Sequence, residues 1–123
     1  SYKGEEQYKA SLESKEMDLV YTYAKLDSIS GELNNKILEI KRLGGDIDSL
    51  MKIKEQLELE KNELRLSRNL AQTRYNDIKD KIEGYEFLLK RKDQDIAKLK
   101  EVNAALLSEN TQLKDERNEM TAQ

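Results

Sequence analysis

One heptad repeat runs almost from end to end of this 123-residue chain, over about residues 5–121. With Leu12 taken as position a, 10 of 16 a positions and 13 of 17 d positions carry apolar residues. A composition with 37% apolar residues would fill roughly 12 of those positions by chance. An uninterrupted repeat of seven is typical of helices in a left-handed supercoil. The pattern therefore predicts an all-α fold, a single long helix in a parallel two-stranded coiled coil.

The apolar a and d residues would form the dimer seam. Isoleucine at a with leucine at d, as in Ile40 and Leu43, favours two parallel strands. Asn103 and Asn110 at a are interpreted as register-setting residues, because buried amides pair only when two chains run parallel and in register; simple tolerance of polar a positions is the alternative. The predicted seam consists of Leu12, Leu19, Leu26, Ile29, Leu33, Ile40, Leu43, Ile47, Leu50, Leu57, Leu64, Tyr75, Ile78, Ile82, Tyr85, Leu89, Ile96, Leu99, Leu106, Leu113 and Met120.

Charges beside the seam also favour a parallel pair. In such a pair each g residue faces the e residue five positions on in the other chain. Each pair stabilises the rod by at most a few tenths of a kcal/mol, so the pairs select direction more than they stabilise. Pairs of opposite sign in the C-terminal half are Glu60/Arg65, Lys81/Glu86, Asp95/Lys100 and Glu109/Lys114.

The chain contains no proline, and none of its glycines falls in the seam, so we expect one rod over residues 1–123. Residues 27–31 and 44–45 are soft points in this rod, because glycine and serine are poor helix formers. A helical hairpin is the alternative at 44–45, with Asp46 as the next N-cap. The seven-residue spacing of Ile40 and Ile47 across these glycines favours the continuous helix. We expect the rod to be part of a longer protein.

Residues that depart from the seam pattern are candidate partner contacts. Successive a positions in the middle carry the cations Lys54, Lys61 and Arg68. They predict either a locally loosened dimer or contact with an acidic partner. Apolar residues widen the seam at e and g, namely Ile37, Met51, Ile53, Leu88, Val102 and Leu107. Among these, Met51 with Ile53 and Val102 with Leu107 are the stronger candidates for docking a third helix or a second dimer.

Composition argues against most chemistries. The chain has no histidine and no cysteine, so thiolate nucleophiles, imidazole bases and soft-metal sites are absent. The net charge is −3 and charges of both signs are interspersed, so the chain has no positive electrostatic field to attract nucleic acid. No stretch approaches the 18 consecutive apolar residues that a membrane-spanning helix needs. We expect Glu58, Glu60 and Glu63 to be solvated. The sequence therefore predicts no enzyme and no catalytic, cofactor-binding or metal site, and neither nucleic-acid binding nor membrane insertion.

Four tyrosines cluster in the N-terminal quarter of the sequence. We interpret them first as seam and seam margin, and second as a binding patch. They are Tyr2, Tyr8, Tyr21 and Tyr23.

Residues 102–120 look like a leucine zipper, with asparagine at a and leucine at d. The basic helix of a zipper transcription factor is missing upstream, so this resemblance implies dimerisation alone. The whole chain is similar in kind to rods of cytoskeletal, tethering and filament proteins, and to fibrillar coiled coils of bacterial surfaces. We expect a structural dimerisation or scaffold rod that pairs with itself or a similar chain in the cytoplasm or cytoskeleton. The alternative is a fibrillar surface or adaptor coiled coil that binds protein ligands.

Overall fold

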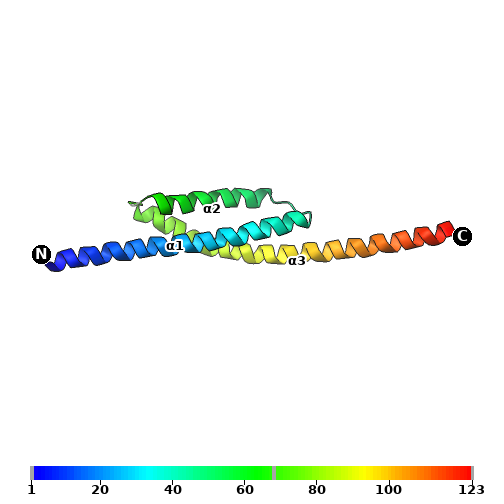
Figure 1. Cartoon of the computed structure of the whole chain (residues 1–123), viewed down its shortest axis with the longest axis horizontal. Coiled ribbons are helices and arrows are strands. Elements are labelled where there is room, and N and C mark those ends of the chain that lie inside the picture. The colour runs from blue at the N-terminus through cyan, green and yellow to red at the C-terminus, as the bar shows by residue number, and fades with distance from the viewer. Residues whose placement is uncertain (1, 68, 123) are drawn as a thin grey trace.

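A computed structural model describes residues 2–67 and 69–122, in which all regular structure is helical. Helix α1 spans Tyr2–Arg42, α2 spans Asp48–Leu66 and α3 spans Gln72–Ala122. Figure 1 shows α2 folding back along α1, while α3 lies beside α1 and the two termini lie at opposite ends. The all-α prediction is confirmed. The prediction of one continuous helix is wrong, because the chain reverses direction twice.

The first reversal is a glycine turn. The Gly45 N–H donates to the Ile40 carbonyl (2.9 Å), which closes the six-residue ring of a Schellman cap. Gly44 has a φ of +83°, a left-handed conformation that glycine adopts without strain. The Asp46 carboxylate then accepts the Asp48 N–H (3.0 Å) as α2 begins. The chain therefore adopts the hairpin alternative at residues 44–45, with Ile47 rather than Asp46 in the N-cap position of α2.

The spacing of Ile40 and Ile47 does not require a continuous helix. Ile40 is buried at the end of α1, and Ile47 packs against the same core from the turn. Both residues face the core, although the chain changes direction between them. The other predicted soft point, residues 27–31, lies inside α1, where Ile29 and Ser30 are buried.

The second reversal follows α2. Ser67 is extended, with φ −102° and ψ 100°, and α3 begins at Gln72. The Arg74 guanidinium holds both Glu63 oxygens, at 2.6 and 2.8 Å, and so ties the start of α3 to the end of α2. Neither glycine nor proline, the two strongest turn signals, occurs between residues 67 and 71, so only Ser67 and Asn69 hint at this reversal in the sequence.

Side-chain bonds give the directions of the helices. Ser30 on α1 donates to Glu58 on α2 (2.5 Å), and Lys61 lies 2.7 Å from Asp27, so the numbering rises on one helix as it falls on the other. Thr22 lies 3.1 Å from Tyr75, and further along Lys36 pairs with Asp93, so the numbering of α1 and α3 rises together. The bundle is thus α1 and α3 in parallel, with α2 antiparallel to both.

The core is a narrow stripe of aliphatic side chains from all three helices. It holds Leu26, Ile29, Leu33, Ile37, Ile40, Leu50, Leu57, Leu64, Ile78 and Leu89. All of these except Ile37 occupy predicted a or d positions. The residues that a coiled-coil dimer would bury between two chains are therefore buried within one chain, by its own α2 and α3.

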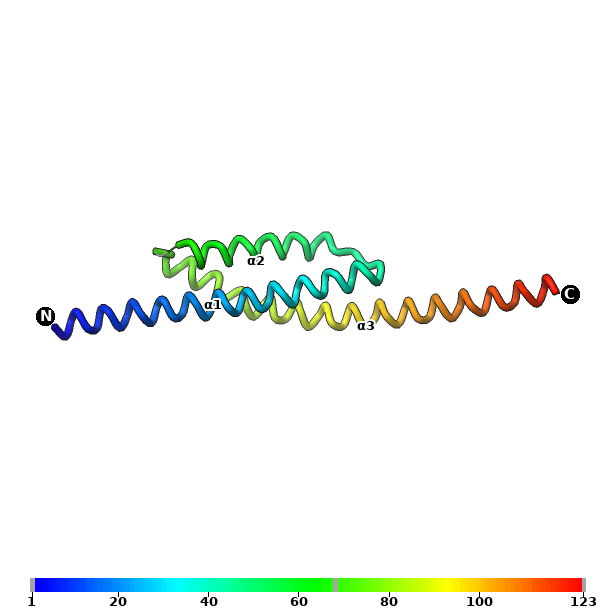
Figure 2. Tube along the Cα trace, viewed as in Figure 1, coloured from blue at the N-terminus to red at the C-terminus, as the bar shows by residue number. Residues whose placement is uncertain are grey.

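The rest of the predicted seam falls into two groups. Half-buried members at the margins of the bundle are Leu19, Leu43, Ile47, Tyr75, Ile82, Tyr85, Ile96 and Leu99. Exposed members are Leu12, Leu106, Leu113 and Met120. Leu12 lies on α1 near its free end, and the other three lie on the part of α3 that extends past the bundle, as the tube in Figure 2 shows. We call residues 104–122 the α3 tail.

Candidate interaction surfaces

The described residues hold no group of three metal-ligating side chains, and none of their helices is long and apolar enough to span a membrane. The functional candidates are therefore charged contacts in the bundle and apolar surfaces outside it.

Lys61, for which the sequence left open a loosened dimer or an acidic partner in another chain, lies beside acidic groups of its own chain. Its ammonium lies 2.7 Å from Asp27 Oδ1 and 3.4 Å from Glu58 Oε1, and 5.7 Å from the centre of the Tyr23 ring. The hydrogen bond to Asp27 raises the pKa of Lys61 above its ordinary value. Because α1 supplies both the anion and the aromatic face, Lys61 holds α2 against α1.

The other two cations of this series are less informative. Lys54 is half-buried on α2, and its charge contributes to lowering the pKa of Glu58, after the larger effect of the Ser30 hydrogen bond. Arg68 lies outside the described residues.

Glu60 is fully buried, so its assignment to a solvated face is wrong. Tyr85 donates its hydroxyl proton to Glu60 Oε1, and the Lys81 ammonium lies 3.7 Å from Oε2, which has no hydrogen-bond partner. Burial, and then the hydrogen bond to Glu60, raise the pKa of Tyr85. A g residue at the edge of the seam becomes enclosed here because α3 folds back over α2. The cluster joins these two helices.

Most of the charges assigned to interchain pairs have partners within the chain. Glu86 lies 3.3 Å from Lys25, and Lys100 lies 3.8 Å from Glu39. Asp95 pairs with Lys92 at 3.0 Å on the same helix. These contacts connect α3 to α1 or to itself. The remaining predicted pair, Glu109/Lys114, lies on the α3 tail, where both residues are exposed.

The two asparagines interpreted as register-setting have different environments. The Asn103 amide donates to the Leu43 carbonyl (3.0 Å) and so attaches α3 to the end of α1. Asn110 is exposed on the α3 tail, seven residues further on. Both asparagines are exposed, but Asn103 is held by a contact within its own chain, whereas Asn110 lies on the tail beyond that contact.

The α3 tail exposes an apolar stripe along one helix. Leu106, Leu113 and Met120 follow each other at intervals of seven and are 51%, 54% and 78% exposed. Val102 and Leu107 flank the stripe and are 54% and 69% exposed. Within the described residues, no other helix covers this stripe.

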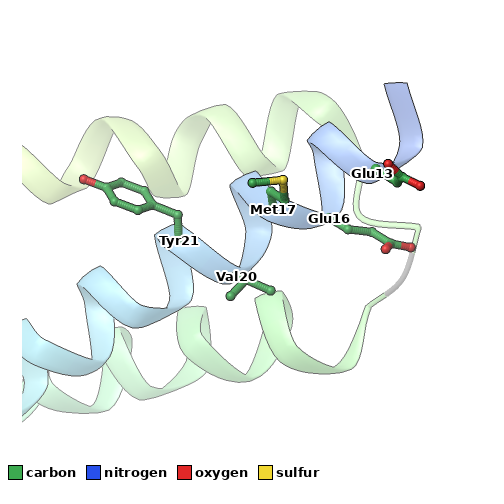
Figure 3. Close-up of a pocket in the computed structure, with 5 residues that line it drawn as sticks. All are labelled: Glu13, Glu16, Met17, Val20 and Tyr21. Carbon is green, nitrogen blue, oxygen red and sulfur yellow. The ribbon is translucent and has the colours of Figure 1, made fainter. Parts of the chain in front are cut away.

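A second apolar surface lies on α1, near the reversal between α2 and α3. Figure 3 shows Met17, Val20 and Tyr21 with Glu13 and Glu16 around a shallow hollow. Met17, Val20 and Tyr21 are each about 70% exposed.

Other candidates from the sequence are spread out rather than gathered. Tyr2 and Tyr8 are exposed toward the free end of α1, whereas Tyr23 packs against the core. Met51 is 37% exposed, and Ile53 packs partly against the core of the bundle. The predicted tyrosine patch is therefore divided, and the pair at 51 and 53 faces its own bundle at least in part.

The chain matches no protein-family model, no curated protein and no solved structure.

Proposed function

We propose that this chain is a structural scaffold element whose α3 tail forms a parallel coiled-coil pair with a second copy. In this proposal the three-helix bundle is a rigid spacer and the tail is the dimerisation segment. The observation that carries it is the heptad stripe of Leu106, Leu113 and Met120 on the α3 tail, which has no neighbouring helix among the described residues. Pairing two such stripes would remove them from water, which is the driving force of coiled-coil formation.

Direction follows from polar groups on the tail. In a parallel pair Glu109 at g faces Lys114 at e of the second copy, and the symmetry of the dimer repeats this contact on the other side. Asn110 would meet its own counterpart at a, where two amides can donate to each other. An antiparallel pair would lose the matched asparagines, so the tail favours parallel alignment.

The bundle suits the role of a spacer. α1 and α3 leave it at opposite ends, and the chain termini point away from each other (Figure 2). Tail pairing would therefore join two bundles at one end and leave both free α1 ends at the other. A cytoplasmic or cytoskeletal scaffold fits this arrangement, and no part of the proposal requires catalysis.

One observation favours the second candidate function, binding of a protein ligand. Met17, Val20 and Tyr21 form an apolar surface with acidic neighbours on α1, away from the tail. Surfaces of this composition are typical of protein contacts. This function would place the binding surface at the opposite end of the bundle from the dimer.

Sedimentation equilibrium of the whole chain tests the proposal. We expect a monomer–dimer equilibrium that the double substitution Leu106→Glu with Leu113→Glu abolishes, because it places four carboxylates in the seam of each pair. The control compares two single substitutions, Leu106→Glu at d and Leu107→Glu at e, which introduce the same charge one residue apart; the substitution at 107 should weaken the dimer far less. A wild-type chain that stays monomeric up to millimolar concentration would contradict tail pairing. So would equal effects of the substitutions at 106 and 107.

A further inference from the structure

The turn between α1 and α2 keeps a sequence property that a closed bundle does not need. Ile40 and Ile47 both occupy position a, and Leu43 and Leu50 both occupy d, so the heptad phase passes through the turn unchanged. A turn between antiparallel helices imposes no relation between their phases, since insertion or deletion of a residue changes only the loop. The preserved phase makes residues 2–66 equally suited to one straight helix.

The same side chains would serve both arrangements. Leu26 and Leu33 on α1 and Leu57 on α2 are almost completely buried in the bundle, and they are a and d residues of the continuous repeat. Opening the bundle would expose them, and pairing the straightened helix with a second copy would bury them again. The closed chain and the opened pair therefore compete for one set of apolar contacts.

The closed turn depends on glycine, whereas a straight helix does not. Gly44 has a φ of +83°, which a residue with a side chain adopts only with strain. A Cβ on Gly45 would lie 2.6 Å from Ile40 Cγ2 and 3.0 Å from Leu99 Cδ1. In a continuous helix these glycines fall at e and f, outside the seam, where alanine is the better helix former. Substitution at 44 and 45 thus disfavours the closed turn and favours the straight helix.

We propose that residues 43–47 are a hinge at which α1 and α2 join into one helix, Tyr2–Leu66, that pairs in parallel with the same helix of a second copy. The tail dimer of the proposed function would align the two chains, so the inference rests on that function for its direction. Pairing would be concentration-dependent, because the closed state needs one chain and the opened state needs two.

Two contacts favour the closed state. Asp27 neutralises Lys61 across the α1–α2 interface, and Ser30 donates to Glu58 beside it. In the opened parallel pair Lys61 would face its own counterpart at a, and Lys54 would do the same one heptad earlier. The opened pair is therefore the minor state of the wild-type chain, and its share should grow with chain concentration.

The test measures the distance between α1 and α2 within one chain. Glu32→Cys and Gln56→Cys place spin labels at exposed sites at the same level of the bundle, and the native chain has no cysteine to interfere. In the closed state the labels lie within about 20 Å, since neighbouring helix axes are about 8–10 Å apart. In a straight helix they are about 36 Å apart, from 24 residues at about 1.5 Å each. Labelled chain is diluted into unlabelled chain so that only intrachain distances are read.

Gly44→Ala with Gly45→Ala should raise the population of the long-distance state relative to the short-distance state about a hundredfold, about tenfold for each glycine. The matched control is Gly31→Ala with Gly84→Ala. These glycines lie inside helices, and a Cβ at either position meets no atom within 4 Å. The control should leave the ratio unchanged, because both states gain the same helix propensity. Wild-type chain should show a long-distance fraction that rises with concentration.

The outcomes separate this inference from the proposed function. Short distances at every concentration in wild-type and Gly44/Gly45 variant chains would overturn the hinge, even if sedimentation shows a tail dimer. A long-distance state that is monomeric would overturn pairing with a second copy. A single label at Gln56→Cys must give an interchain distance under about 25 Å in the opened form, as expected for adjacent parallel helices. A longer distance would overturn parallel pairing. If the long-distance population is unchanged in the variant Leu106→Glu with Leu113→Glu, the hinge opens without the tail dimer, and the claim that the tail aligns the opened pair is overturned.

Discussion

The bundle and the α3 tail carry the same heptad pattern but bury it differently. Leu57 in the bundle has no exposed surface, whereas Leu106 in the tail, also at d and also leucine, is half exposed. The difference lies in what the chain can fold against each helix. α2 and α3 reach α1 across the bundle, but among residues 2–67 and 69–122 no helix extends beside residues 104–122. A heptad pattern therefore specifies a helix face to be covered, and leaves open which chain covers it.

Truncating the two leucines should separate their roles most strongly. Leu57→Ala should lower the free energy of unfolding by about 3 kcal/mol, because it leaves a cavity in a fully enclosed site. Leu106→Ala should change the unfolding of dilute monomer by less than about 0.5 kcal/mol, since the side chain is already in contact with water. Chemical denaturation at low micromolar concentration measures both. Equal effects at 57 and 106 would mean that the bundle is not the stable unit.

Polar contacts of the bundle provide a second, smaller difference. Tyr85→Phe removes the donor to the fully buried Glu60 carboxylate and should cost about 2 kcal/mol. Tyr75→Phe removes a hydroxyl at a half-buried site, 3.1 Å from Thr22, and should cost about 1 kcal/mol or less. Denaturation of the two variants beside the wild type would show the order. If Tyr75→Phe costs more, the α2–α3 contact at Glu60 is not the tighter one.

Acid should weaken the bundle by the smallest amount. The Ser30 hydrogen bond lowers the pKa of Glu58, and Arg74 lowers that of Glu63, below the ordinary value of 4.5. A carboxyl with a lowered folded pKa stabilises the fold above its unfolded pKa and loses that contribution as pH falls through the folded value. When the pH is lowered past about 4.5, we expect the free energy of unfolding to decrease. Each of the two groups should contribute less than about 1 kcal/mol to this decrease, because both are near the surface. Glu58→Gln with Glu63→Gln should flatten this part of the pH profile, and an unchanged slope would contradict the assignment.

The sequence was sufficient for the all-helical structure and for the helix face that is buried, but not for the division into three helices. Nine of the ten buried apolar residues in the described part of the chain occupy predicted seam positions. The turns could not be predicted with the same ease, since a and d spacing is identical in a rod and in a bundle. Gly44-Gly45-Asp46 offered a usable signal, a C-cap followed by an acidic residue that accepts an N–H at the start of α2. The seven-residue spacing of Ile40 and Ile47 favours a continuous helix instead, and so conflicts with this signal.

Other features depend on tertiary contacts that no local pattern contains. The reversal after Leu66 lacks glycine and proline, and it is held by Arg74 reaching back to Glu63. Burial of Glu60 follows from that reversal, because α3 then brings Tyr85 over the carboxylate. For Lys61 the sequence left open a loosened dimer or an acidic partner in another chain, whereas the acidic group beside it is Asp27 of the same chain, 34 residues away in sequence.

Amide hydrogen exchange at several chain concentrations tests most directly the claim that one heptad pattern is buried in two ways. We expect residues 26–33 and 57–64 to be protected already at low concentration, because in the closed state their neighbours belong to the same chain. Residues 104–122 should exchange rapidly when dilute and become protected as concentration rises, because their neighbour is a second copy. Equal concentration dependence in all three segments would contradict the intrachain bundle. Protection of residues 104–122 that does not change with concentration would contradict the tail dimer.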